Sequence, residues 1–174
     1  DYLSQSGMTP VIPLDLKIDD MLFRYGVRIN ATLVQDLQCL PVPVDVSNNP
    51  QQPNWQPMPW TYAPLLLTSH ASPITRNLMQ VSSTMASTIE FVGGEDGIQK
   101  EVLLATSSNS RITGTPAQVD LGFDDANPED YRYAYVPVAA SMEGVFPSLF
   151  AHLLPPEEVV MHSPMRKHSE KTKQ

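Results

Sequence analysis

Glycine-rich loops that hold phosphates need a particular spacing, and this sequence lacks it. A nucleotide cradle would read GxGxxG or GxxxxGK[ST] between a strand and a helix, so that backbone amides meet the phosphates. Neither pattern occurs, and the run Gly93-Gly94-Glu95-Asp96-Gly97 places acids where phosphate would bind. We therefore interpret this run as a hairpin loop and predict no bound cofactor.

Side chains for hydrolysis are not arranged in a recognisable catalytic pattern either. A serine hydrolase of the α/β type would show GxSxG, and a zinc protease would show HExxH on a helix. Both patterns are absent from the sequence. We predict that the chain is not an enzyme and has no catalytic residues.

Metal-binding side chains are present but scattered. The single cysteine, Cys39, excludes thiolate clusters and a disulfide within the chain. The four histidines are far apart, at His70, His152, His162 and His168. One acidic group could surround calcium or form a solvated turn, and it lacks the spacing of an EF-hand: Asp120, Asp124, Asp125, Glu129 and Asp130. We predict no metal site.

Three aromatic side chains stand among prolines and form the candidate partner or ligand surface: Trp55, Trp60 and Tyr62. This composition is used to fold a loop onto its own domain, and also to build a rigid aromatic contact surface. Beside Asp45 and Asn54, the same side chains could provide a stacking platform for a sugar or a peptide. The sequence leaves both interpretations open.

The charge of the chain bears on its partners. Its net charge is −8, from 11 basic and 19 acidic residues. Phosphate binding needs a concentrated cationic surface, so no nucleic acid partner is expected. No stretch of the sequence is apolar for long enough to span a bilayer, and no signal peptide is evident. Any membrane attachment is expected through segments absent from this chain.

One amphipathic helix is predicted over about residues 16–25. Ile18, Met21, Leu22 and Tyr25 have the spacing of one apolar stripe. Asp15 is the expected cap, and Gly26 is the expected stop. Residues 33–37 are then predicted to form a strand.

The following segment, residues 40–64, is rich in proline. Its prolines stand at positions 41, 43, 50, 53, 57, 59 and 64. Proline cannot donate to a strand ladder, so we predict a long irregular excursion there and no central strand.

Further strands are predicted along the second half. Residues 88–92 and 101–106 are expected to form a hairpin with a longer loop. Over residues 117–123, Ala117 and Val119 alternate with Gln118 and Asp120, which predicts a half-buried strand that continues through Leu121 and Phe123. Residues 133–143 could form a central strand bent at Pro137.

The C-terminal part changes in composition. Ser148 is a possible cap of a short helix that carries Leu149, Phe150 and Leu153. After Pro155-Pro156 the chain is polar and lacks apolar periodicity. We predict one domain over residues 1–154 and a polar, mobile tail over residues 155–174.

Several segments resemble one family in the same order along the chain. Residues 14–38 (LDLKIDDMLFRYGVRINATLVQDLQ) are similar to GldG-type proteins, in which a helix ending in YGV or YGI leads into LVQD. The similarity continues at residues 58–67 (MPWTYAPLLL), 72–78 (SPITRNL), 90–93 (EFVG), 102–111 (VLLATSSNSR) and 143–151 (EGVFPSLFA). None of these segments carries a catalytic motif.

This resemblance implies a non-catalytic auxiliary protein of an ABC transporter linked to gliding motility in Bacteroidetes. It implies an internal extracytoplasmic or periplasmic fragment, held at the inner membrane by segments outside this chain. The expected partners are the permease and ATPase subunits, reached through protein contacts. The expected fold is α/β or α+β, a β-rich mixed sheet with one or two helices from a larger Rossmann-like domain. The alternative function is a periplasmic sugar-binding or peptide-binding module.

Overall fold

The computed structural model describes residues 8–47, 49, 51–94, 96–120 and 127–148. Its first half contains β1 (Met8–Val11), α2 (Asp19–Arg24), β2 (Val27–Ile29), β3 (Thr32–Asp36), β4 (Cys39–Asp45) and β5 (Trp55–Thr68). Its second half contains β6 (Gln80–Ser82), β7 (Ile89–Phe91), β8 (Gln99–Ala105), β9 (Ser110–Gly114), β10 (Ala117–Asp120), the 3-10 helix η1 (Pro128–Asp130) and β11 (Pro137–Glu143). The expected β-rich class with few helices is confirmed.

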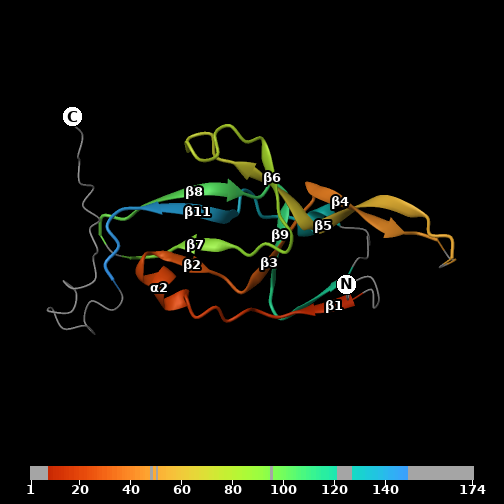
Figure 1. The fold of residues 1–174 in the computed structure, drawn as a ribbon, viewed down its shortest axis with the longest axis horizontal. Helices are drawn as coiled ribbons and strands as arrows, with labels where there is room; N and C mark the ends of the chain where they lie inside the picture. Colours follow the sequence, from red (N-terminus) through yellow and green to blue (C-terminus); the bar gives the residue numbers. More distant parts are fainter. Residues whose placement is uncertain (1–7, 48, 50, 95, 121–126, 149–174) are drawn as a thin grey trace, which may run out of the picture.

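Long β5 connects the strand ladders of the molecule (Figure 1). It belongs to a five-stranded sheet in the order β11-β8-β5-β4, and β6 also pairs with β5. The pairs β1-β10, β2-β7 and β3-β9 form separate ladders. Residues 85 and 86 join β3 to β5 through the backbone. Val34 N donates to Ala86 O at 2.9 Å, and Met85 N donates to Tyr62 O at 2.8 Å. All these strand pairs are antiparallel, whereas we expected a mixed sheet.

The proline-rich segment was predicted to be irregular, and this prediction is wrong. β4 and β5 form a ribbon that projects at the right of Figure 1, and within it Pro41 pairs with Pro59 and Pro43 with Pro57. Prolines that face each other cannot exchange hydrogen bonds, so their donor-less nitrogens point to the outer edges of the ribbon. The intervening residues, such as Val42 and Met58, carry the ladder. Proline is therefore compatible with both strands.

The helix is present but shorter than predicted. It begins at Asp19, and its cap residue, Ile18, makes no side-chain capping bond. Asp15 does not cap it, because its carboxylate binds the backbone N–H and the ammonium group of Lys17. Lys17 has a φ of 58°, a left-handed conformation that interrupts the helix before it can start at residue 16. The four residues of the predicted apolar stripe, from the N-cap Ile18 to the C-cap Tyr25, are all half-buried, so only the predicted start of the helix is wrong.

Gly26 follows the helix, and the backbone passes very close to another loop there. Its φ is +90°, and an added Cβ would lie 2.5 Å from Gly93 O. Gly26 O also accepts from Val92 N at 3.0 Å, while Lys100 Nζ donates to Val92 O at 3.0 Å. These contacts place β7 beside β2 rather than beside β8. The predicted hairpin of residues 88–92 and 101–106 is therefore wrong.

The strand predicted over residues 133–143 starts only at β11. It pairs with β8 and is an end strand of the five-stranded sheet, so the central position we considered is not observed. Beyond it, Tyr25 OH donates to Pro147 O at 2.9 Å, and the Tyr25 and Phe146 rings meet edge to face at 5.0 Å. The helix after Ser148, with Leu149, Phe150 and Leu153, and the tail at 155–174 lie outside the described residues.

The largest buried cluster forms where β3, β5 and β10 meet: Leu33, Trp60, Ala63 and Val119. Trp60 is only 7% exposed, and its indole Nε1 donates to Asp120 O at 3.0 Å. The predicted alternation in residues 117–120 is confirmed, because Val119 is buried and Gln118 is exposed. Leu121 and Phe123 of the same predicted strand lie outside the described residues.

A buried carboxylate fixes the end of β3. The strand predicted over residues 33–37 is confirmed as β3. Asp36 is fully buried, and its Oδ2 accepts from Ser107 N at 2.7 Å. Its Oδ1 accepts from Ser107 Oγ at 2.6 Å and from Gln38 N at 2.8 Å. A buried charge is tolerated when its lone pairs are satisfied in this way. Asp36 thus ties β3 to the turn between β8 and β9.

The same turn is bound to the segment before β11. Thr106 Oγ1 lies 3.0 Å from Ser110 Oγ and accepts from Val136 N at 2.9 Å. Ser110 Oγ donates to Tyr133 O at 2.9 Å. Thr106 and Ser110 are fully buried, so these bonds are shielded from water. The polar network therefore holds three chain segments around Asp36.

We predict that Asp36→Asn destabilises the fold by about 1–3 kcal/mol. An asparagine can present only one oxygen, so an amide donor would face the Ser107 N–H and leave a buried donor unpaired. Asp45→Asn is the matched control, because Asp45 accepts both of its backbone bonds through Oδ1 alone and is exposed. Urea unfolding followed by circular dichroism measures both changes. An equal loss of unfolding free energy in the two variants would contradict the role of Asp36 as a buried acceptor that stabilises the fold.

Trp60→Ala should lower the free energy of unfolding by about 3–5 kcal/mol, because it leaves a cavity in the core and an unpaired carbonyl. Trp55→Ala should change it by about 0.5 kcal/mol or less, since that side chain is 61% exposed. Thermal melts of both variants test the difference. A stable Trp60→Ala protein would show that this side chain does not support the core.

Candidate functional site

The structure separates the three aromatic side chains that form the candidate surface. Trp55 is exposed near the end of the projecting ribbon, whereas Trp60 is buried in the core. Tyr62 is half-buried, and its ring lies 6.0 Å from that of Trp60. The three side chains therefore do not form one continuous platform. Of these three side chains, only Trp55 is exposed.

Trp55 belongs to an exposed face of the ribbon that is built mainly from proline. The face consists of the odd-numbered positions on both strands: Pro41, Pro43, Asp45, Trp55, Pro57 and Pro59, all of them exposed. Side chains at alternate positions of a strand point to the same side, which explains this grouping. The opposite face carries Val42, Val44 and Met58, which are half-buried. We call the exposed face the proline face.

Asp45 and Asn54 close the ribbon beside Trp55. Asp45 Oδ1 accepts from Ser47 N at 2.9 Å and from Asn54 N at 2.8 Å. The bonds from Ser47 and Asn54 hold the pKa of the Asp45 carboxyl below its usual value. Asp45 pairs with Trp55 across the ribbon. These hydrogen bonds position Trp55. Asp45 and Asn54 are therefore engaged within the ribbon.

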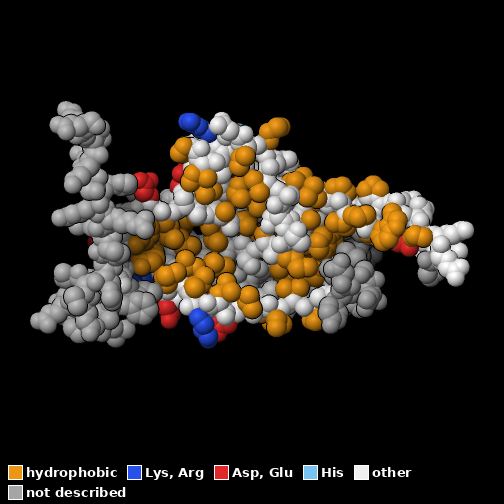
Figure 2. Space-filling view, in the orientation of Figure 1, with side chains coloured by type: hydrophobic (Ala, Val, Ile, Leu, Met, Phe, Trp, Pro, Cys, Tyr) orange, Lys and Arg blue, Asp and Glu red, His pale blue; other side chains and the backbone are white. Residues whose placement is uncertain are grey.

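The ribbon is almost uncharged. Between residues 37 and 69, Asp45 is the sole acidic residue, and no lysine or arginine occurs. Figure 2 shows hydrophobic side chains along the ribbon, while the charged side chains in this view lie mostly elsewhere. A rigid, apolar and uncharged surface of this kind is suited to contact with another protein.

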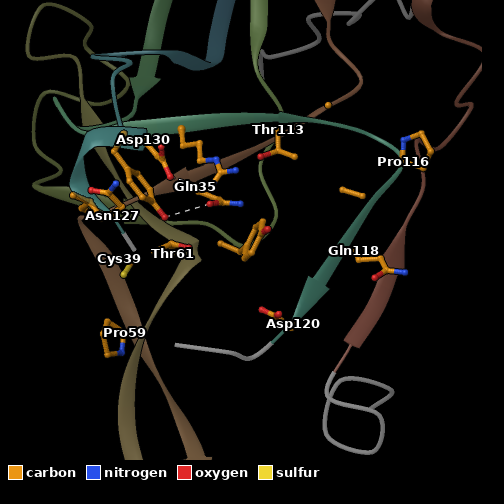
Figure 3. Close-up of a pocket in the computed structure, with 16 residues that line it drawn as sticks. Gln35, Cys39, Pro59, Thr61, Thr113, Pro116, Gln118, Asp120, Asn127 and Asp130 are labelled. Atoms are coloured by element: carbon orange, nitrogen blue, oxygen red, sulfur yellow. Dashed lines mark hydrogen bonds and ion pairs between the residues drawn. The ribbon is translucent and has the colours of Figure 1, made fainter. Parts of the chain in front are cut away.

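A cleft of about 730 Å³ opens where the base of the ribbon meets β9 and β10 (Figure 3). Its lining comes from β3, β5, β9, β10 and η1 and is rich in polar side chains: Gln35, Thr61, Tyr62, Arg111, Thr113, Gln118, Asp120, Asn127, Asp130 and Tyr131. Pro59 and Cys39 add apolar surface. The volume lies within the range of small-molecule sites in proteins.

Buried polar groups form one side of the cleft. Tyr131 OH donates to Gln35 Oε1 at 3.2 Å, and both residues are buried. Arg111 Nη1 lies 3.9 Å from Asp130 Oδ2, a loose ion pair at the rim. Burial, and then the charge of Asp120, raises the pKa of the Tyr62 phenol. The phenol is therefore a neutral hydrogen-bonding group at neutral pH.

The one thiol that lines the cleft is not activated. Burial, with the nearby charge of Asp36, raises the pKa of the Cys39 thiol, which therefore remains a poor nucleophile. Among the residues that the structure describes, no histidine lines the cleft to act as a base for this thiol. Within the described residues we find no catalytic constellation.

The acidic group considered for calcium is only partly visible. Asp124 and Asp125 lie outside the described residues. Asn127 Oδ1 accepts from Glu129 N at 3.1 Å and caps η1, which places Asp130 near Arg111. Among the residues that the structure describes, no three His, Cys, Asp or Glu side chains gather in a way that could hold a metal ion.

Sequence analysis missed most of the cleft. Gln35, Arg111 and Tyr131 follow no motif, because they come from separate strands and a turn. One signal was present: the alternation in residues 117–120 placed Gln118 and Asp120 on the face opposite the core, and both line the cleft. The polar residues Gln118 and Asp120 therefore indicated that one face of this strand is in contact with solvent.

Comparison with curated proteins and with solved structures found no match. None of the described helices is long and apolar enough to cross a membrane. A family model with the description ABC-type uncharacterized transport system matches residues 1–174. The chain therefore belongs to this family of auxiliary components of ABC transport systems.

Proposed function

We propose that this chain acts without catalysis, as an extracytoplasmic module that docks onto its transporter through the proline face. The observation that carries the proposal is Trp55, which is 61% exposed on a proline-rich ribbon whose one charged side chain is Asp45. The family supports the transport setting, since its members are auxiliary components of ABC transport systems. The ribbon supplies a surface for the contact.

The energetics favour Trp55 as the anchor of such a contact. Proline restricts the backbone, and the closure at Asp45 fixes the end of the ribbon, so little conformational entropy is lost on binding. A tryptophan also buries a large apolar area at an interface and is enriched among the residues that dominate binding energy. Trp55 combines both properties, whereas Trp60 is occupied in the core.

The finer assignment follows from the resemblance to GldG-type proteins. We infer that the partner is the permease of the same system, acting together with its ATPase, and that the system serves gliding motility. We place the chain in the periplasm of a Bacteroidetes cell, held at the inner membrane through segments outside this chain. What supports this is the sequence similarity of several segments, residues 14–38 among them, to GldG-type proteins. Identifying the genes beside this one tests the assignment, since a permease and an ATPase are expected there.

The alternative function, a sugar-binding or peptide-binding module, needs a different surface from the one first considered. A stacking platform of Trp55, Trp60 and Tyr62 is not supported, because Trp60 is only 7% exposed. Asp45 already accepts backbone bonds within the ribbon. The proline face therefore suits a protein better than a sugar.

We predict no binding of ATP with magnesium. The chain carries net negative charge, and the backbones of Gly93 and Gly94 pack closely against Gly26. Isothermal calorimetry with the full chain should show no saturable heat. Saturable binding in the micromolar range would overturn the non-catalytic interpretation.

Trp55→Ala should weaken binding to the cognate permease complex by about thirtyfold, or about 2 kcal/mol, because it removes the anchor. Met79→Ala is the matched control, since Met79 is 90% exposed and lies outside the ribbon. Biolayer interferometry with the purified complex in detergent measures both affinities. If Met79→Ala weakens binding and Trp55→Ala does not, the docking surface lies elsewhere.

A further inference from the structure

The cleft at the base of the ribbon has the properties of a second site, which shares Pro59 with the proline face. It is built before any ligand arrives, because Gln35 is 6% and Tyr131 is 5% exposed while their side chains are hydrogen-bonded to each other. Polar side chains held in this way keep one orientation. A site of this kind recognises a ligand by hydrogen bonds in fixed directions.

The charges of the cleft select against an anionic ligand. Arg111, Asp120 and Asp130 line it, and Arg111 already lies 3.9 Å from Asp130. An anionic ligand would meet the two carboxylates and the negative field of the whole chain, with its net charge of −8. A neutral ligand avoids this penalty.

The hydrogen-bonding groups of the cleft are mixed in kind. Asp120 can only accept and Arg111 can only donate, whereas the Tyr62 hydroxyl does both. A ligand hydroxyl can pair with each of these three groups, because it both donates and accepts.

Flat apolar surface lies next to these groups. The ring of Tyr62 lines the cleft, and Pro59 adds apolar surface lower on the ribbon (Figure 3). One side of a ligand can therefore stack on the Tyr62 ring while its rim hydrogen-bonds. A pyranose ring has this double character, with C–H faces and a rim of hydroxyl groups. We propose that the cleft binds a neutral saccharide of one or two sugar units. Binding of the saccharide does not require the ribbon to dock, although Pro59 belongs to both surfaces.

Intrinsic fluorescence provides the test, because Trp60 lies 6.0 Å from Tyr62 and reports on the cleft. The full chain is titrated with maltose, cellobiose and N,N′-diacetylchitobiose, and with glucose 6-phosphate and trialanine as charged probes. Saturable binding of at least one neutral disaccharide is expected, and the charged probes should bind at least tenfold more weakly. If no neutral probe binds, or if the charged probes bind as well, the proposal is wrong.

Variants place the binding in the cleft. Arg111→Ala and Tyr62→Phe should each weaken disaccharide binding about tenfold, since each removes a hydrogen-bonding group. Arg28→Ala is the matched control, because Arg28 is also exposed and pairs with Glu90 at 3.1 Å on the β2-β7 ladder. Calorimetry and thermal melts separate lost binding from lost folding. If Trp55→Ala abolishes binding and the cleft variants do not, the sugar site is on the ribbon and the proposal is overturned.

Discussion

The buried carboxylate of Asp36 is the constraint on which the rest of the structure depends. It has no basic partner among the described hydrogen bonds and ion pairs, so its charge is balanced by two backbone N–H groups and the hydroxyl of Ser107. Those donors come from both sides of the β3-β9 ladder and must therefore meet at one point. Gln35 precedes Asp36 in the strand and forms part of the cleft. The carboxylate thus sets the position of the site as well as that of the turn.

Local patterns predicted several elements correctly. The apolar stripe located the helix, residues 33–37 indicated β3, and the alternation of Ala117 and Val119 indicated β10. These signals depend on neighbours in the chain. The start of the helix was wrong because the backbone of Lys17, rather than side-chain periodicity, decides it.

Long-range pairing could not be predicted in the same way. β7 and β8 are both good strand sequences, and their partners are decided by the close approach of Gly26 and Gly94. The cleft is lined by residues of β3, β4, β5, β9, β10 and η1, most of which are distant in sequence, so no spacing revealed it. The prediction for the proline-rich segment was wrong because it counted the prolines without asking whether they alternate along the strand. Pro41, Pro43, Pro57 and Pro59 all stand at odd-numbered positions, where the backbone nitrogen points away from the partner strand. Parity also separates Trp55, at an odd position of β5, from Trp60, at an even one.

The proline pairs of the ribbon also bear on how this protein behaves before it meets a partner. An exposed two-stranded arm normally offers its outer N–H groups to any passing strand, which is how sheets extend into aggregates. Where Pro41 and Pro43 face outward on one strand, and Pro57 and Pro59 on the other, those donors are missing. The arm can therefore display an apolar tryptophan without recruiting other copies of itself through backbone pairing at these positions. Association at these positions of the ribbon must therefore be made by side chains. An exposed apolar surface can in this way remain selective for its partner.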